Sequence, residues 1–146
     1  MSDEVMILKA SSQEDNAAVT ECLKEFISYG VDFNAGTSYS GLSYDFSYIR
    51  ECDGLVVGML SIRPDGGEIG NLGYAIRPTE QGKGYGKMLV SQALDLCSMF
   101  DVKCPEAVVD EANIPSIKVL LANGFSEKER KEAGGRKVIR FVHEGI

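Results

Sequence analysis

Two stretches of the chain carry apolar residues at the three- and four-residue spacing of a helix with one buried face. The first covers residues 13–29, with Ser11 or Ser12 suited to cap its start and Gly30 suited to end it. The second covers residues 86–100. The apolar positions are Val19, Cys22, Leu23, Phe26 and Ile27 in the first stretch and Leu89, Val90, Ala93, Leu94 and Cys97 in the second. This spacing predicts two amphipathic helices.

Short runs rich in apolar, aromatic and β-branched residues predict the strands. These runs lie at residues 5–9, 43–52, 55–62, 68–77, 106–110, 125–131 and 136–143. Asp53-Gly54 is a strong hairpin turn between the second and third runs, and Gly134-Gly135 separates the last two. Pro115 and the pair Asn123-Gly124 bound a short third helix over 115–122, while residues 30–41 are predicted to form a loop or a weak helical turn.

The order of these elements predicts an α/β fold. The strands within 43–77 follow one another through short turns and should form an antiparallel meander. Residues 68–110, by contrast, run strand, helix, strand, which implies a parallel crossover. We therefore expect a mixed, mostly antiparallel sheet with flanking helices. No repeat, linker or low-complexity tract divides the chain, so residues 1–146 are expected to form a single domain.

Charge and cysteine usage argue against several classes of function. The 146 residues carry a net charge of −7, whereas a surface that binds duplex nucleic acid needs clustered lysine and arginine. The four cysteines are scattered and His143 is the only histidine, so no metal site is expected. No apolar run reaches membrane-spanning length and the start lacks a signal-peptide pattern. We expect a cytoplasmic protein with no membrane partner.

The strongest chemical signal lies where the strand at 68–77 gives way to the helix at 86–100. Gly82, Gly84 and Gly86 alternate there, next to Lys83 and Lys87. The first amides of a helix lack internal partners and carry partial positive charge, and glycines let the backbone approach a ligand closely. The spacing fits neither the Walker loop nor the dinucleotide-binding fingerprint. It indicates a diphosphate held by backbone amides; the alternative at this point is a glycine-rich turn that binds nothing.

Two motifs together resemble the GNAT superfamily of N-acetyltransferases. Residues 81–86 (Gln-x-x-Gly-x-Gly), after a strand that ends at 76–78 (Ile-Arg-Pro), are similar to the family's acetyl-CoA signature. Downstream, Asn113 opens a segment that ends in Gly124-Phe125, which looks like the family's second motif. The resemblance is clearest over residues 55–125.

The resemblance implies that acetyl-CoA binds in a splay between the strands at 68–77 and 106–110. The pantetheine arm would pair with the backbone near 74–76, the loop amides would take the diphosphate, and Asn113 would hydrogen-bond the arm. The residues implied to bind the cosubstrate are Ala75, Ile76, Gln81, Gly82, Lys83, Gly84, Tyr85, Gly86, Lys87, Asn113 and Ser116.

The same resemblance implies direct attack of a neutral amine on the thioester, with a strand amide near 72–74 stabilising the developing oxyanion. Many relatives have a glutamate where this chain has Gly70 and a tyrosine where it has Leu120. The usual base and acid are therefore missing. Glu68, expected on the same face of the strand, is the predicted substitute base, acting through a water. Tyr74 is the predicted substitute acid, with Tyr85 and Tyr44 as alternatives. Acceptor specificity is expected to depend on residues 26–44.

The expected function is transfer of an acetyl group from acetyl-CoA to the amine of a small molecule or peptide, by a monomer or homodimer. A non-catalytic acyl-CoA-binding domain of the same fold is the first alternative, because positions 70 and 120 depart from the family pattern. A nucleotide-binding regulator that uses the same loop is the second. Thermal shifts with acetyl-CoA and ATP, together with release of CoA thiol in the presence of amines, separate the three.

Overall fold

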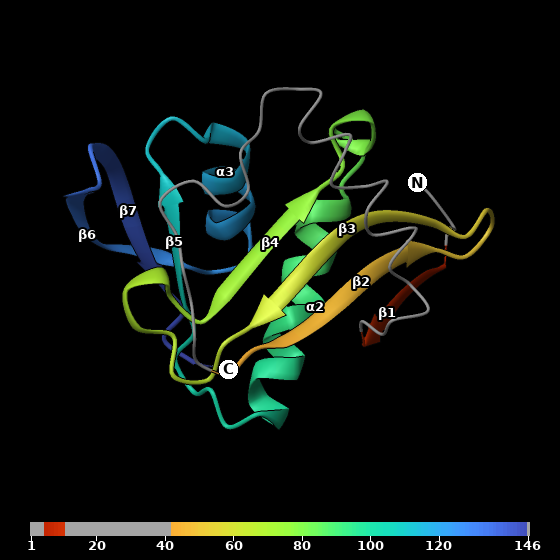
Figure 1. The fold of residues 1–146 in the computed structure, drawn as a ribbon, viewed down its shortest axis with the longest axis horizontal. Coiled ribbons are helices and arrows are strands. Elements are labelled where there is room, and N and C mark those ends of the chain that lie inside the picture. The colour runs from red at the N-terminus through yellow and green to blue at the C-terminus, as the bar shows by residue number, and fades with distance from the viewer. Residues whose placement is uncertain (1–4, 11–41, 146) are drawn as a thin grey trace.

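The fold is built on one sheet in which most strands are antiparallel. The computed structural model describes residues 5–10 and 42–145. Its strands are β1 (Met6–Ala10), β2 (Tyr44–Arg50), β3 (Leu55–Ile62), β4 (Leu72–Ile76), β5 (Glu106–Asp110), β6 (Ser126–Ala133) and β7 (Arg136–Val142). Within this part of the chain the strand order is β1-β2-β3-β4-β5-β7-β6 (Figure 1). Only β4 and β5 pair in parallel, which confirms the predicted mixed α/β fold.

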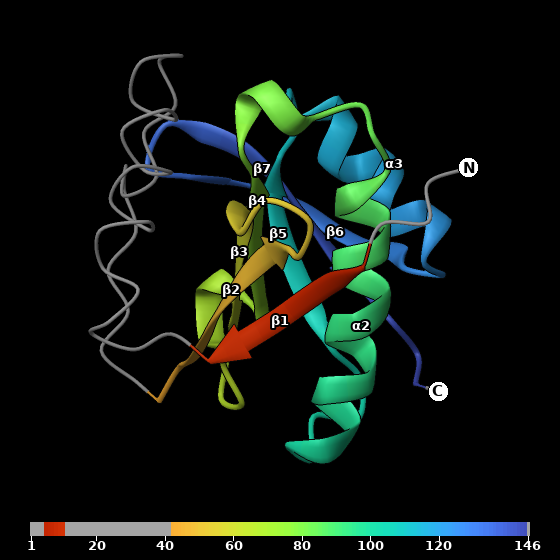
Figure 2. The ribbon, with the colours of Figure 1, turned by 90° about the vertical axis from the view of Figure 1, so that its right-hand side faces the viewer.

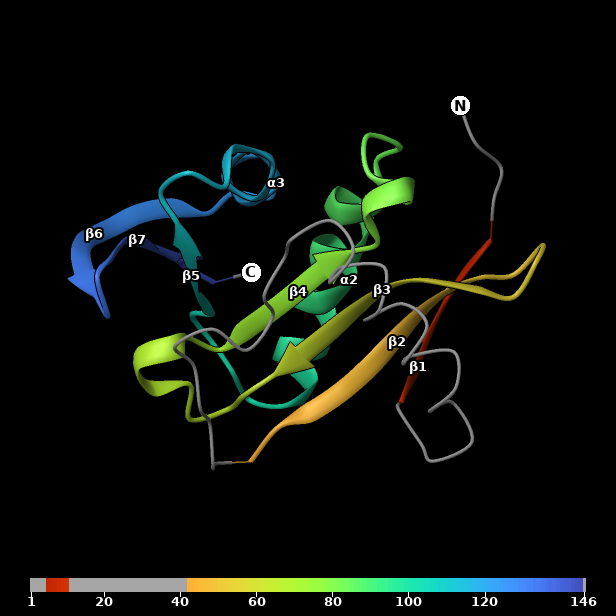
Figure 3. The same ribbon diagram turned by 45° about the horizontal axis from the view of Figure 1, so that its top comes forward.

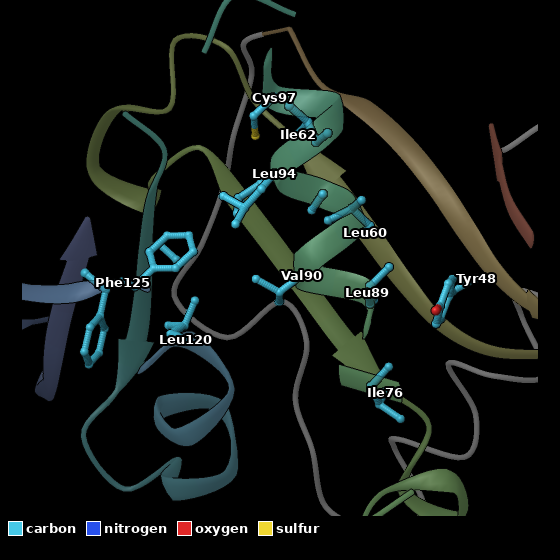
Figure 4. Packing of buried hydrophobic residues seen from close by; sticks show 14 of the residues in the cluster. Tyr48, Leu60, Ile62, Ile76, Leu89, Val90, Leu94, Cys97, Leu120 and Phe125 are labelled. Atoms are coloured by element: carbon cyan, nitrogen blue, oxygen red, sulfur yellow. The ribbon is translucent and has the colours of Figure 1, made fainter. Parts of the chain in front are cut away.

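The two α-helices of the described residues cover one face of the sheet (Figure 2). The helix α2 (Tyr85–Met99) is the crossover between β4 and β5, and α3 (Ile114–Ala122) links β5 to β6. Buried side chains of α2 pack against residues of the sheet, among them Leu60 and Ile62 of β3. Leu120 of α3 joins the same core beside Phe125 (Figure 4). Burial of these apolar groups fixes both helices against the sheet and so positions the loop that precedes α2.

Most of the predicted elements agree with the structure. The runs at 55–62 and 106–110 match β3 and β5 at both ends. The other confirmed elements differ from their predicted ranges only at the ends: 5–9, 43–52, 86–100, 115–122, 125–131 and 136–143. The predicted helix at 13–29 and loop at 30–41 lie outside the described residues.

The predicted strand at 68–77 is wrong over its first residues. Gly67–Ile69 form a short 3-10 helix, η2, and β4 begins only at Leu72. Gly70, with a φ of 79°, takes the chain out of the extended conformation just before β4. Glu68 therefore lies on η2, and the alternation argument that placed it on one face of the strand with position 70 does not apply.

β4 and β5 separate after a single register position. Among the described residues, Leu72 is the one residue of β4 that pairs with β5, opposite Ala107. By contrast, β4 pairs with β3 over the whole of Leu72–Ile76, and β5 pairs with β7 over the whole of Glu106–Asp110. Figure 3 shows β4 and β5 diverging toward their carboxyl ends. The splay predicted between these strands is therefore present.

Candidate functional site

Alternate residues of β4 direct their backbone groups toward the splay. At the end of the β3–β4 ladder, Arg77 N donates to Val57 O at 2.7 Å. Since bonded residues alternate along an antiparallel pair, the backbone of Ala75 also faces β3. Tyr74 and Ile76 face the other way, toward β5. Of the predicted arm-binding residues, Tyr74 and Ile76 therefore have backbone groups directed to the splay, and Ala75 does not.

The loop after β4 begins with a hydrogen bond that closes the strand. Pro78–Glu80 form a 3-10 turn, η3, and Gln81 Nε2 then donates to Ile76 O at 3.0 Å. The side chain of Gln81 thus satisfies the last carbonyl of β4. This bond orders the first residue of the glycine-rich loop, where the sequence predicts contact with the cosubstrate.

The helix α2 begins after a glycine and not after a residue with a capping side chain. Gly84 is the N-cap, with a φ of 87°, and no side chain of the described residues caps the helix. A Cβ at Gly84 would meet nothing within 4 Å, so its left-handed φ, and not crowding, favours glycine. Met88 N makes a bond to Gly84 O at 3.2 Å. The amides of Gly86 and Lys87 precede that bond and have no partner within the described chain, as an anion site requires.

The start of α2 is held by close contact with α3. A Cβ at Gly86 would lie 3.3 Å from Val119 Cγ2, so the missing side chain lets the two helices approach. Asn123 Nδ2 donates to Lys87 O at 3.2 Å and to Val119 O at 3.0 Å. The sequence predicts Asn123 only as the end of α3, and its bond to the first turn of α2 is an addition from the structure.

Tyr74, Asn113 and Ser116, three of the predicted site residues, come together where β4 faces α3. Tyr74 Oη lies 2.7 Å from Ser116 Oγ. Asn113 is the N-cap of α3 and accepts from Ser116 N through Oδ1 at 3.3 Å. Burial raises the pKa of Tyr74 to about 12, although the Ser116 hydrogen bond acts in the opposite direction. The phenol is therefore protonated at neutral pH.

A buried carboxylate lies directly before the loop. Glu80 pairs with Arg50 of β2 and with Lys83, whose Nζ lies 3.1 Å from Glu80 Oε2. Burial raises the pKa of Glu80, but hydrogen bonds from Lys83 and Arg50 outweigh it, and the pKa stays below its usual value. The sequence predicts that Lys83 offers its charge to a diphosphate. In the structure that charge is shared with Glu80, and exposed Lys87 is the second loop cation.

Sequence reasoning missed Arg50 and Glu80. The sequence did contain a signal for Glu80: it is an acidic residue next to a loop predicted to bind a diphosphate. A carboxylate in that place needs a cation as its partner. No comparable signal identified Arg50 as that cation, since the two residues are 30 positions apart in the sequence and meet only in the folded chain.

Neither of the positions predicted from the family resemblance to carry a base and an acid offers such a side chain here. A Cβ at Gly70 would lie 2.8 Å from Glu106 O, and Leu120 is fully buried in the core. Glu68 is exposed on η2, where its backbone oxygen accepts from Arg140 Nη2 at 2.9 Å. Glu68 precedes β4 whereas the glycine-rich loop follows it, so the structure does not bring Glu68 into the group formed by Tyr74 and Ser116. Its role as a base stays a prediction.

The groups that the site offers are backbone amides of β4 and α2, the hydroxyls of Tyr74 and Ser116, and the ammonium of Lys87. The described residues contain no group of three His, Cys, Asp or Glu side chains arranged to hold a metal ion. None of the described helices has the length and apolar character needed to cross a membrane.

Known proteins share this fold. The chain superposes on ribosomal-protein-S5-alanine acetyltransferase from Vibrio fischeri with a TM-score of 0.79 and 15% identity, over 97% of this chain and 94% of that one. A mutant of spermidine N-acetyltransferase from Vibrio cholerae gives a TM-score of 0.71 and 16% identity, over 94% and 92% of the two chains. No curated protein matches the sequence. The sequence does match the acetyltransferase (GNAT) family over residues 16–125, and the chain therefore belongs to that family.

Proposed function

We propose that the chain transfers an acetyl group from acetyl-CoA to a primary amine, by direct attack of the amine in a ternary complex. The observation that carries this proposal is the splay between β4 and β5, followed by the glycine-capped N-terminus of α2. A pantetheine arm needs an extended backbone edge to pair with, and a diphosphate needs amides with positive potential. One strand–loop–helix unit supplies both.

Backbone groups would hold most of the cosubstrate. The amides of residues 82–87 suit the diphosphate, with Lys87 adding charge beside them. On the side of β4 away from β3, Tyr74 offers its backbone N–H and carbonyl, and Ile76 offers its N–H, since its carbonyl already accepts from Gln81. Asn113 uses its Oδ1 to cap α3, which leaves its Nδ2 as a donor toward the arm. The open space around Gly84 is compatible with a ligand that approaches the backbone closely.

The amine must lose its proton before it attacks the thioester. A lysine-like amine with a pKa of about 10.4 costs roughly 4–5 kcal/mol to deprotonate at pH 7, whereas an α-amine near 8 costs about 1 kcal/mol. Glu68 is the predicted base, acting through water from its exposed position on η2. The backbone amide of Tyr74, directed toward the splay, is suited to stabilise charge on the thioester oxygen.

Tyr74 is suited to donate a hydrogen bond to the departing sulfur. Its pKa of about 12 keeps the phenol protonated. A CoA thiolate should have a pKa near that of cysteine, about 8.5, so full proton transfer from Tyr74 would be uphill by several kcal/mol. The thiolate can leave as an anion at neutral pH. We therefore assign Tyr74 the part of a hydrogen-bond donor to the thiolate.

The acceptor is proposed to be the amine of a small molecule or a peptide. The structural neighbours named above include acetyltransferases for a ribosomal-protein alanine and for spermidine, two amines of different size. The net charge of −7 favours approach of a cationic acceptor. We expect the enzyme to act in the cytoplasm as a monomer or homodimer.

A non-catalytic acyl-CoA-binding domain remains the second candidate. The observation in its favour is that the two positions where many relatives have a base and an acid are occupied by Gly70 and Leu120, which are buried and carry no ionisable group. Such a domain would bind acetyl-CoA without releasing CoA thiol in the presence of any amine. A nucleotide-binding regulator would instead be stabilised by ATP and not by acetyl-CoA.

Thermal shift with CoA, acetyl-CoA, longer acyl-CoAs and ATP tests the proposal, followed by a thiol-release assay over a panel of amines. We expect acetyl-CoA, and not ATP, to raise the melting temperature. Gly84→Phe should abolish the CoA shift, because Gly84 has a φ of 87° and begins the diphosphate-binding turn. Gly54→Phe is the matched control, since Gly54 also has positive φ and open surroundings but lies in the β2–β3 hairpin. An undiminished CoA shift in Gly84→Phe would rule out this loop as the binding site.

A further inference from the structure

A single guanidinium contacts residues on both sides of the glycine-rich loop. Arg50, the last residue of β2, donates from Nη1 to Glu80 Oε1, directly before the loop. The same Nη1 lies 3.1 Å from Tyr85 Oη, at the first position of α2. Arg50 Nη2 also lies 2.7 Å from Asp53 Oδ2 in the hairpin turn. The residues on either side of the loop, Glu80 and Tyr85, therefore contact the same side chain, which belongs to β2.

This contact is largely removed from solvent. The side chains of Arg50 and Glu80 are 13% and 8% exposed. A buried carboxylate without a cation carries a large desolvation cost, so Glu80 stays in place only while it is paired. Lys83, the other partner of Glu80, is 50% exposed and follows Gln81 within the loop itself. Arg50 is thus the partner that ties Glu80 to the sheet.

The glycine-rich loop needs such a tie. Glycines lose more conformational freedom on folding than other residues, and an amide cradle works only if its donors are held in position before the ligand arrives. A planar guanidinium makes several directed hydrogen bonds at once, which an ammonium group on a flexible chain cannot reproduce. Arg50 meets Glu80, Tyr85 and Asp53 in this way.

We infer that Arg50 is a positioning residue for cosubstrate binding: through Glu80 and Tyr85 it sets the spacing of the two ends of the diphosphate-binding loop. This inference rests on the proposed function. It predicts that loss of Arg50 weakens recognition of the diphosphate part of acetyl-CoA and leaves recognition of the acyl-pantetheine part unchanged.

The test compares Arg50→Met and Arg50→Lys with the wild type, and with Arg130→Met as a matched control. Arg130 lies on β6, is 57% exposed and pairs with Glu127 at 2.8 Å, far in the sheet order from the loop. Calorimetry gives the dissociation constant of CoA. Kinetics with an amine substrate gives KM for acetyl-CoA and for acetyl-pantetheine, a thioester that lacks the diphosphate.

We expect the dissociation constant of CoA and the KM for acetyl-CoA to rise about tenfold or more in Arg50→Met and by less in Arg50→Lys. The KM for acetyl-pantetheine should change by less than about twofold, and Arg130→Met should behave as the wild type. Glu80→Gln combined with Arg50→Lys should add less than the sum of the single effects, because the two side chains act through one contact.

An equal rise in KM for acetyl-CoA and for acetyl-pantetheine would overturn the inference, because it would indicate a general disruption of the site. An unchanged dissociation constant for CoA in both Arg50 variants would also overturn it, while the proposed function stood. If Arg50→Met does not fold, the same comparison in Arg50→Lys decides. Failure of the wild-type protein to bind CoA would instead remove the proposed function itself.

Discussion

The two ends of β4 differ in how they are held. At its start the strand is joined on both sides: Arg63 N, just after β3, donates to Asn71 O at 2.7 Å, and on the side of β5 Asn71 N donates to Glu106 O at 2.7 Å. At its end, β4 keeps β3 on one side, and its polar contacts on the other side pass to Ser116 of α3 and Gln81 of the loop. The first end of β4, the joined end, thus continues the sheet, whereas the second, the open end, adjoins the proposed binding site.

Gly70→Glu should break the joined end and gives the largest expected effect. Its Cβ would lie 2.8 Å from Glu106 O, in a backbone conformation with φ of 79° that side chains rarely adopt. The overlap is with backbone, so it cannot be relieved by a rotamer change. We expect a loss of about 3 kcal/mol or more in the free energy of unfolding, measured by urea denaturation. The substitution restores the glutamate of many relatives, yet we expect no gain in activity.

Gly54→Glu provides the comparison for that experiment. Gly54 also has a positive φ, 68°, but a Cβ there would meet nothing within 4 Å. Only the backbone strain remains, which costs about 1 kcal/mol. If both variants lost the same free energy, crowding between β4 and β5 would not explain the glycine at position 70.

Asn71→Ala should weaken the joined end to a smaller degree. Asn71 Nδ2 donates to Arg63 O at 2.9 Å and to Pro64 O at 3.2 Å, and Oδ1 accepts from Glu106 N. Removing the side chain leaves partly buried backbone groups without these partners. We expect about 2 kcal/mol of destabilisation in urea denaturation.

Asn123→Ala tests the open end, where we expect a smaller loss of stability than at the joined end. Asn123 bonds Lys87 O and Val119 O, both in helices that are held by packing as well. We expect a loss of stability below about 1 kcal/mol, together with weaker CoA binding because the first turn of α2 loses its tie to α3. Stability losses in the reverse order would contradict the division between the two ends of β4.

The contrast also shows what the sequence could predict. β3 was predictable because its apolar run follows the turn at Asp53-Gly54, and β5 because residues 107–109 form a short apolar run; both are local signals. The glycine-rich loop was predictable for the same reason. The run at 68–77 misled because Ile69 and Leu72 continue an apolar pattern across Gly70, and apolar pattern outweighed a glycine that ends extended structure.

Contacts between distant segments lay beyond sequence reasoning. The single pairing of Leu72 with Ala107 depends on where two strands diverge in space, and no local pattern records that. The ion pair of Arg50 with Glu80 and the hydrogen bond of Tyr74 with Ser116 likewise join segments that only packing brings together. The residues that suit the loop to bind a diphosphate are adjacent in the sequence, whereas the residues that hold the loop in place are distant in the sequence.

Glu80→Gln tests the electrostatic support of the open end, and its expected effect depends on pH. The net pKa of Glu80 is lowered because hydrogen bonds from Lys83 and Arg50 outweigh burial. A carboxyl group with a depressed folded pKa contributes stability above its unfolded pKa, about 4.3, and loses that contribution as pH falls through the folded pKa. We therefore expect Glu80→Gln to be less stable than the wild type by about 1 kcal/mol at pH 7, and the difference to vanish in stronger acid.

Urea denaturation between pH 3 and pH 7 measures this convergence, with Glu127→Gln as the matched control. Glu127 pairs with Arg130 on the exposed surface of β6, so the control should stay within about 0.5 kcal/mol of the wild type at every pH. A constant difference between Glu80→Gln and the wild type down to pH 3 would mean that Glu80 acts by shape and not by charge. We expect charge to be the cause, because the carboxylate of Glu80 is buried against Arg50 in the turn between β4 and the glycine-rich loop.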